Sequence, residues 1–202
     1  MFRRHHVLVV FFLALLGLTG CSTQPIPQTE WQTHQNALAE ITDFTAKGKV
    51  ALISPEQRVS ANFVWEQKDD ELSLRLTNFL GTTLFKLDAT PDIAVLVDGD
   101  GERYVGRNAA SLLKQLTGIA LPVDEMMQWV KGLPAEQNEY TLGADNRLAF
   151  LSENKADTNQ AGWQLEYTGY DADTNNLLPS KIKMNQHQQK VNLVISEWVL
   201  PQ

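Results

Sequence analysis

The chain has 202 residues, with 17 Lys and Arg against 24 Asp and Glu, a formal net charge of −7 and a single cysteine. Its 43% hydrophobic and 20% charged residues lie near globular averages, which excludes a disordered chain and a polytopic membrane protein. One cysteine excludes an intramolecular disulfide and a Cys-based zinc cluster, because both need more than one thiol. The acidic balance argues against binding to nucleic acid, whose phosphates are neutralised by clustered Lys and Arg.

The N-terminal segment has the pattern of a secretory signal peptide. Residues 3–6 are basic (RRHH), and residues 7–18 form an apolar run (VLVVFFLALLGL). That run is shorter than the roughly 20 residues that a helix needs to span the hydrocarbon core of a bilayer. A short apolar run behind a basic segment is typical of a signal peptide. We therefore expect residues 1–20 to be removed from the mature protein.

Residues 18–21 (LTGC) resemble the bacterial lipobox, in which the cysteine is acylated and becomes the first residue after cleavage. The resemblance makes Cys21 the lipid attachment site, and the alternative is an ordinary signal peptide with a chance cysteine. Three acyl chains make a stable anchor, because each buried methylene contributes about 0.8 kcal/mol. By analogy with lipoproteins of enteric bacteria, Ser22 is compatible with the outer membrane. Residues 21–28 carry no charge and two prolines, so they are predicted to form a tether.

Residues 29–202 are predicted to form a single domain that begins with a helix and continues as a sheet. Trp31, His34, Leu38 and Ile41 recur at helical spacing, so we expect an amphipathic helix over residues 29–44. After residue 57 the hydrophobic period changes to two, which is typical of half-buried strands. The predicted strands are residues 57–67, 72–77, 83–89, 93–97, 103–106, 147–151, 163–168, 181–184 and 191–199.

Two further helices are expected in the middle of the chain. Asn108 and Gly118 are typical start and stop residues for a helix over residues 109–116, and Pro122 opens another over residues 123–131. Both helices are apolar enough to be buried, through Leu112, Leu113, Leu116, Met126, Met127, Trp129 and Val130. About ten strands and three helices fit a strongly curved antiparallel sheet with helices packed in or across its mouth.

The sequence offers no pattern of catalytic chemistry. It contains no G-x-S-x-G, no H-E-x-x-H and no Gly-rich phosphate loop. His34 and His187, the histidines that remain after processing, are interpreted as surface residues. The acidic clusters at residues 98–102 and 171–176 lack the Gly that a calcium loop needs at position 6, so both are interpreted as turns. No feature of the sequence points to a pair of carboxylates that could catalyse glycoside hydrolysis. We therefore predict no enzyme, no metal and no cofactor.

Residues 78–82 (NFLGT) form a turn whose tip is apolar, although the tips of hairpins normally face water and are polar. Phe79 and Leu80 are adjacent, so extended backbone cannot point both the same way, and at least one is expected to be exposed. Both could instead make minor core contacts. If the tip touches lipid or a partner, burying one Leu contributes roughly 1.5 to 3 kcal/mol, which suits transient engagement.

The chain resembles the LolB family of outer-membrane lipoprotein receptors. The resemblance covers nearly the whole chain and is carried, after the lipobox, tether and first helix, by residues 60–65 (SANFVW), 76–82 (LTNFLGT), 116–118 (LTG), 128–134 (QWVKGLP) and 169–171 (GYD). It implies a mainly β fold with α-helices: an incomplete antiparallel β-barrel of about ten or eleven strands, with helices over its mouth and an enclosed apolar cavity.

The resemblance also implies a function. A periplasmic carrier of the LolA type would hand over lipoproteins, whose acyl chains enter the cavity and are then inserted into the inner leaflet of the outer membrane. In this family a protruding leucine in the loop between two early strands is needed for delivery, and the matching position is Leu80. Family members often have Pro where this chain has Phe79, which adds a second apolar side chain. The expected protein is a monomer, lipid-anchored in the outer membrane of a Gram-negative bacterium and facing the periplasm.

Three other readings remain open from the residues alone. The domain could hold another hydrophobic ligand, such as a fatty acid or a phospholipid. It could be a lipid-acting hydrolase, which would depend on His34 or His187. It could be a scaffold without a ligand. The sequence assigns no residues to the lining of the cavity and no docking surface to the carrier.

Overall fold

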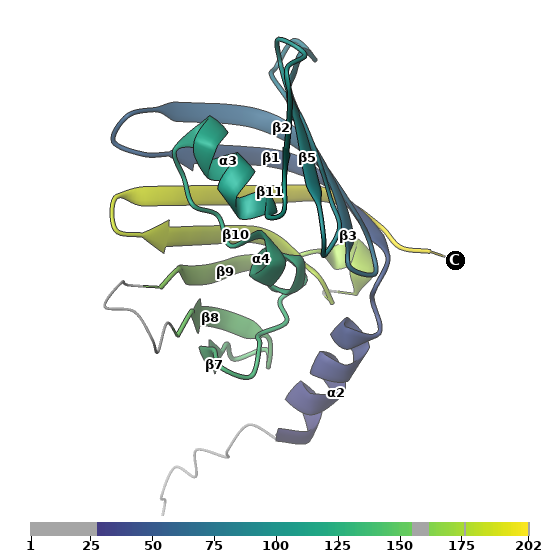
Figure 1. The fold of residues 1–202 in the computed structure, drawn as a ribbon. Helices are drawn as coiled ribbons and strands as arrows, with labels where there is room; N and C mark the ends of the chain where they lie inside the picture. Colours follow the sequence, from purple (N-terminus) through teal and green to yellow (C-terminus); the bar gives the residue numbers. More distant parts are fainter. Residues whose placement is uncertain (1–27, 155–161, 176, 202) are drawn as a thin grey trace, which may run out of the picture.

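The computed structural model describes residues 28–154, 162–175 and 177–201 (Figure 1). The predicted signal peptide, Cys21 and the tether up to residue 27 lie outside the described residues. The described strands form one antiparallel sheet of 11 strands in the order β6-β5-β4-β3-β2-β1-β11-β10-β9-β8-β7. Their bounds are β1 Phe44–Ile53, β2 Arg58–Lys68, β3 Glu71–Thr77, β4 Thr83–Ala89, β5 Ala94–Asp98, β6 Arg103–Gly106, β7 Glu139–Leu142, β8 Leu148–Ser152, β9 Gln164–Tyr170, β10 Pro179–Gln186 and β11 Gln189–Val199.

Alternating side chains bend this sheet around an apolar interior. In β3, Leu72, Leu74 and Leu76 are buried, and the residues between them are exposed or half-buried. The same period of two runs through β2 and β10. Strand β1 pairs with β11, which joins the two ends of the chain at the centre of the sheet. The outer strands β6 and β7 do not pair with each other in the described sheet, so the predicted incomplete antiparallel barrel is confirmed.

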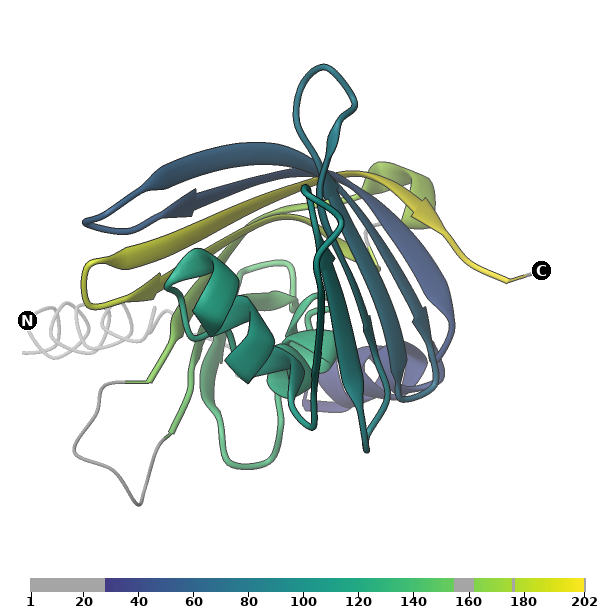
Figure 2. The ribbon, with the colours of Figure 1, turned by 45° about the horizontal axis from the view of Figure 1, so that its top comes forward.

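Two helices lie across the concave side of the sheet, between β6 and β7 in the chain (Figure 2). Helix α3 (Ala109–Thr117) is capped by Asn108, whose side chain accepts a hydrogen bond from the Ser111 amide, and ends at Gly118, whose φ is 73°. Helix α4 (Val123–Trp129) follows Pro122. Both present buried apolar side chains to the sheet, so the expected position of the helices is confirmed. Leu116 is an exception, with 37% of its surface exposed.

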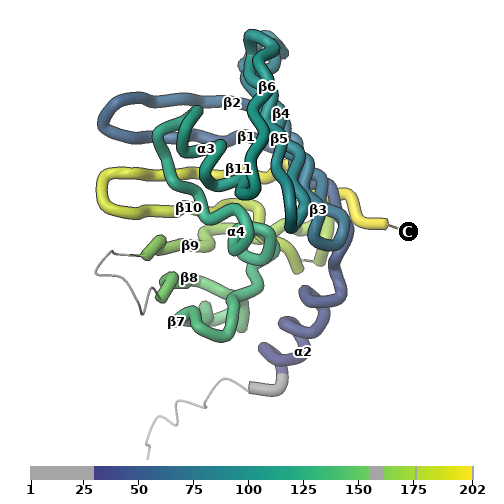
Figure 3. The backbone as a smooth tube through the Cα atoms, in the orientation of Figure 1, coloured from purple at the N-terminus to yellow at the C-terminus, as the bar shows by residue number. Residues whose placement is uncertain are grey.

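Helix α2 (Gln28–Ala39) lies at one end of the molecule, outside the sheet (Figure 3). It is held there by the buried side chains of Trp31 and Leu38. A single turn of 3-10 helix, η1 (Ala172–Thr174), connects β9 to β10. None of the helices among the described residues is long and apolar enough to cross a membrane.

The structure corrects the end of one predicted helix and adds two strands, β1 and β7, to those expected. The helix expected over residues 29–44 is wrong at its C-terminal end, because α2 ends at Ala39 and β1 begins at Phe44. Ile41 continues the helical spacing, but from Phe44 the buried residues of β1 alternate, with Ala46, Val50 and Leu52 on the same face and Gly48 as the gap in the pattern. Strand β7 was not predicted, because its residues are exposed or half-buried and show no alternation.

Candidate functional site

Both apolar residues of the turn at residues 78–82 point into solvent. Phe79 is 88% exposed and Leu80 is 76% exposed. The prediction that at least one of them is exposed is therefore confirmed, and the alternative of minor core contacts is wrong. Figure 2 shows the loop between β3 and β4 projecting beyond the rest of the sheet.

The turn is held rigidly by Asn78. Its Oδ1 accepts hydrogen bonds from the amides of Leu80 at 2.9 Å and Thr82 at 3.0 Å. Its own amide donates to the Thr82 carbonyl at 2.9 Å, and Gly81 closes the turn with a φ of 86°. A glycine adopts this left-handed conformation without steric cost. The two apolar side chains are thus presented on a pinned backbone, and burying them elsewhere requires little further ordering of the loop.

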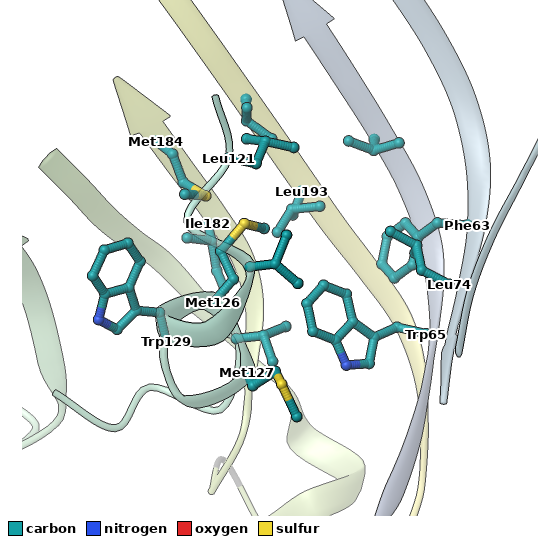
Figure 4. Close-up of a cluster of buried hydrophobic side chains, with 14 of the residues drawn as sticks. Phe63, Trp65, Leu74, Leu121, Met126, Met127, Trp129, Ile182, Met184 and Leu193 are labelled. Atoms are coloured by element: carbon teal, nitrogen blue, oxygen red, sulfur yellow. The ribbon is translucent and has the colours of Figure 1, made fainter. Parts of the chain in front are cut away.

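The interior between the helices and the sheet is apolar and almost full (Figure 4). It contains a cavity of about 40 Å³, whereas pockets that bind organic ligands have volumes of about 300 to 1,000 Å³. Leu113, Leu121 and Met126 of the helical segment occupy the space opposite Trp65 and Leu193 of the sheet. Its lining residues are Val50, Leu52, Phe63, Trp65, Leu74, Leu76, Phe85, Leu113, Thr117, Leu121, Met126, Val191 and Leu193.

Buried polar groups fix helix α4 and the segment after it. The Tyr167 hydroxyl on β9 donates to the Trp129 carbonyl at 2.8 Å, and the Trp129 indole donates to Asn138 Oδ1 at 3.1 Å. The Lys131 ammonium donates to the Ile41 carbonyl at 2.7 Å, and burial lowers the pKa of Lys131. Each group has low exposure, so water does not compete well for these bonds. Helix α4 is therefore a fixed part of the interior wall.

The two histidines have different environments. His187 is exposed at the turn between β10 and β11, where its φ is 52°, so its interpretation as a surface residue is confirmed. For His34 that interpretation is wrong, because its ring stacks on Trp31 with 5.5 Å between ring centroids and its Nε2 is buried without a hydrogen bond to the described residues. Burial, with a smaller contribution from Arg147, lowers the pKa of His34.

The two acidic clusters are turns, as predicted. Asp98 Oδ1 accepts hydrogen bonds from the amides of Asp100 at 3.0 Å and Glu102 at 2.9 Å. Asp171 caps the helical turn η1 through the Thr174 amide at 3.1 Å. Both carboxylates therefore fix the backbone of their own turns by accepting hydrogen bonds from it. In the part of the chain that the structure describes, no group of three or more His, Cys, Asp and Glu side chains is placed to hold a metal ion.

The interior lining was not identified from the sequence, although part of the signal was present. Val50 and Leu52 belong to β1, which is not among the predicted strands. Phe63, Trp65 and Leu74 lie at alternate positions of strands that were predicted, but which face is concave depends on the pairing of strands distant in the chain. The contribution of Leu113, Leu121 and Met126 depends on how the helices cross the sheet.

A curved, open antiparallel sheet with helices across its concave face defines the LolA-like class of folds. A LolA superfamily protein from Nitrosomonas europaea superposes with a TM-score of 0.56 at 11% identity, covering 85% of this chain and 93% of that chain. A putative outer membrane lipoprotein-sorting protein domain from Vibrio parahaemolyticus gives a TM-score of 0.50 at 12% identity, covering 85% and 91%. At these identities the similarity shows the fold.

Similarity of sequence identifies the family. The family model of outer membrane lipoprotein LolB matches residues 42–198. The outer-membrane lipoprotein LolB of Vibrio vulnificus is 37% identical over 99% of this chain and 100% of its own length. The LolB protein of Vibrio cholerae is 38% identical over 93% of each chain, and that of Pectobacterium atrosepticum is 34% identical over 93% of each chain. The chain belongs to the LolB family of outer membrane lipoproteins.

Proposed function

We propose that this protein accepts lipoproteins from a LolA-like periplasmic carrier by binding their acyl chains, and inserts them into the inner leaflet of the outer membrane. The observation that carries the proposal is the rigid turn that exposes Phe79 and Leu80 beside an apolar half-barrel. Membership of the LolB family and the LolA-like fold support it. In this proposal residues 1–20 are the signal peptide, Cys21 is acylated, residues 21–28 are the tether and residues 29–202 are the receptor domain.

The interior would receive the acyl chains between the helices and the concave face. Its lining is apolar apart from Thr117, so a chain that leaves the carrier meets a surface of the same kind. Transfer between two apolar environments changes the free energy little per methylene. The direction of transfer therefore depends on the difference in affinity between carrier, receptor and bilayer. The cavity of about 40 Å³ has to widen when a chain enters.

The turn at residues 78–82 would deliver the lipoprotein to the bilayer. Phe79 and Leu80 each contribute roughly 1.5 to 3 kcal/mol when they leave water for the lipid. That is enough to bring the mouth of the domain to the membrane for a short time and too little to fix it there. Phe79 adds apolar area beside the leucine, so both residues are assigned to the delivery loop.

The test uses the LolA-type carrier loaded with a labelled lipoprotein, residues 22–202 of this protein and liposomes. We expect Leu80→Glu to take the label from the carrier as the wild type does but to leave it out of the floated liposomes, because a carboxylate does not enter the hydrocarbon. Thermal stability should change little, since Leu80 is exposed. Val105→Glu on β6 is the control, because Val105 is 51% exposed and distant from the loop in sequence.

Normal delivery by Leu80→Glu would overturn the role of the loop. Failure of the wild type to take any label from the carrier, together with binding of free palmitate, would instead show a lipoprotein that holds another hydrophobic ligand. Loss of transfer in His34→Ala or His187→Ala that leaves folding intact would point to the hydrolase alternative.

A further inference from the structure

A hollow opens on the surface between two hairpin turns and the end of helix α3. Its volume is about 640 Å³. One wall is the turn between β1 and β2, the second is the turn between β10 and β11, and the third is the end of α3. Figure 1 shows these two hairpins extending on the same side of the molecule as α3. The lining residues are Pro55, Glu56, Gln57, Lys114, Leu116, Thr117, Gly118, Ala120, Gln186, His187, Gln188 and Gln189.

Only a thin partition separates this hollow from the apolar interior. Thr117 lines both the outer hollow and the inner cavity of about 40 Å³. Its hydroxyl donates to the Leu113 carbonyl at 2.7 Å, one turn back in α3, so this polar group is already bonded and adds little barrier to an apolar chain. Leu116 beside it is partly exposed to the hollow. The hollow therefore borders the interior, with Thr117 between them.

Two glutamines bond the partition to the hairpin turns, in addition to the packing of the buried Leu113 and Ile119 on either side of it. The Gln57 amide on the β1–β2 turn donates to the Thr117 carbonyl, and the Gln189 amide at the start of β11 donates to the Gly118 carbonyl at 3.5 Å. Both side chains come from hairpin ends beside solvent, where water can replace either bond. A neutral hydrogen bond of this kind contributes only about 0.5 to 1.5 kcal/mol net.

The other side of the helical segment is held by hydrogen bonds from buried side chains. Beyond the partition, the buried indole of Trp163 donates to the Ala120 carbonyl at 3.3 Å. Further on, α4 is fixed by Tyr167 and Asn138 through Trp129. If the helices separate from the sheet, the end of α3 is therefore the part that moves first, and α4 stays.

We propose that this hollow is the entrance for a long acyl chain, and that the hydrogen bond from Gln57 to the Thr117 carbonyl is its gate. The proposal rests on the proposed function, because it assumes that acyl chains bind inside. The chain would pass Leu116, displace the end of α3 from the two hairpin turns and slide between Leu113 and the concave face. The freed Gln57 and Gln189 amides would bond to water or to the polar end of the ligand.

A second large hollow is a poorer entrance. It has a volume of about 570 Å³ and lies beside the C-terminal residues 199–201. Its walls carry four carboxylates, against the one of Glu56 in the first hollow, and these would lose hydration as an acyl chain covered them. It shares no lining residue with the inner cavity.

The first arm of the test weakens the gate. Residues 22–202 contain every described helix and strand, and uptake of a fluorescent palmitate is followed by stopped flow. We expect Gln57→Ala to take up palmitate about two- to tenfold faster than the wild type. This is the change in rate that corresponds to the net free energy of one neutral hydrogen bond. Gln164→Ala, on the exposed side of β9, is the matched control and should not change the rate. An unchanged rate in Gln57→Ala would overturn the gate.

The second arm blocks the hollow. Cys21 is the single cysteine of the chain, so residues 22–202 with Leu116→Cys react with a bulky maleimide at one position. We expect at least about a tenfold slower uptake of palmitate and slower transfer of labelled lipoprotein from the carrier, with the circular dichroism spectrum unchanged. Val105→Cys with the same label is the control for modification of an exposed apolar residue. Normal transfer of lipoprotein in the blocked protein would overturn the entrance, even if palmitate uptake were slowed.

The two proposals fail in different ways. An unmodified wild type that binds neither palmitate nor the lipoprotein from the carrier contradicts the proposed function itself. A wild type that takes up both, and is unaffected by the label on Leu116→Cys, contradicts the entrance alone.

Discussion

Trp65 lines the interior of the incomplete barrel. Its side chain is 4% exposed and lines the inner cavity, and its indole donates to Gln67 Oε1 at 3.4 Å. We expect Trp65→Ala to lower the free energy of unfolding by about 3 to 5 kcal/mol, because it removes a large buried aromatic side chain. Urea unfolding measures this, with Ser60→Ala on the exposed face of β2 as the control. A loss below about 1 kcal/mol would show that Trp65 borders open space.

Tyr167 gives a prediction for alkaline pH. Burial raises the pKa of Tyr167 well above its ordinary value, so the folded protein keeps a proton that the unfolded chain releases above a pH of about 10. The stabilisation is complete below that pH and is lost as the pH rises further. Tyr167→Phe should be less stable than the wild type at pH 8 by about 0.5 to 1.5 kcal/mol, since it loses the bond to the Trp129 carbonyl.

The same variant should lose less stability than the wild type between pH 9 and pH 11. Urea unfolding at both pH values is the measurement. Equal losses in the two proteins would mean that Tyr167 ionises in the folded state as it does in water.

At the scale of single residues, exposure is predicted correctly where an apolar side chain stands at a position that is normally polar. Phe79 and Leu80 stand at a turn that should be polar, and their exposure follows from that conflict. The prediction of exposure failed for His34, because the stacking on Trp31 and the neighbouring Arg147 depend on the docking of α2 against a distant part of the sheet.

Among the elements, strand β1 has a bulge that bends the sheet where it meets β11. The register shifts between Lys47 and Gly48, and a Cβ on Gly48 would lie 2.0 Å from the Val194 carbonyl oxygen. We expect Gly48→Ala to destabilise the protein by about 1 to 3 kcal/mol or more, because backbone rather than a side chain has to move. Thermal unfolding tests this, with Lys49→Ala on the exposed face as the control, expected within about 0.5 kcal/mol of the wild type. A fully stable Gly48→Ala would show that the bulge does not need glycine.

Elements with local start and stop signals were predicted well. Asn108 and Gly118 placed α3 to within one residue, because a cap and a left-handed glycine act through neighbouring backbone. Strand β1 is absent from the predicted strands, since Gly48 interrupts the apolar alternation of its buried face. Strand β7 has no local signal, and it exists because β8 offers it a partner edge.

At the scale of the whole molecule, attachment to the membrane is assigned to Cys21. We expect Cys21→Ala to move the protein from the outer membrane fraction into a fraction without membranes, because the acyl chains provide the anchor and the described helices cannot span a bilayer. Fractionation followed by immunoblotting measures this, with Ser22→Ala as the control. Continued membrane association of Cys21→Ala would contradict the assignment.

The curved sheet was expected from the pattern of strands, but its order was not. The pairing of β1 with β11 joins residues near the two ends of the domain, and no local pattern encodes a contact of that span. The open edges at β6 and β7 follow from that order.

The gap between β6 and β7 means that no closed ring of strands fixes the size of the interior. In a closed barrel the number of strands and their stagger set the circumference, so the barrel cannot widen without breaking backbone hydrogen bonds. This sheet is open between β6 and β7, so these two edge strands can move apart while all 11 strands keep their partners. Widening separates apolar side chains, and a guest hydrocarbon supplies the contacts that they lose. An open sheet can thus hold almost nothing at rest and still enclose long chains of different lengths.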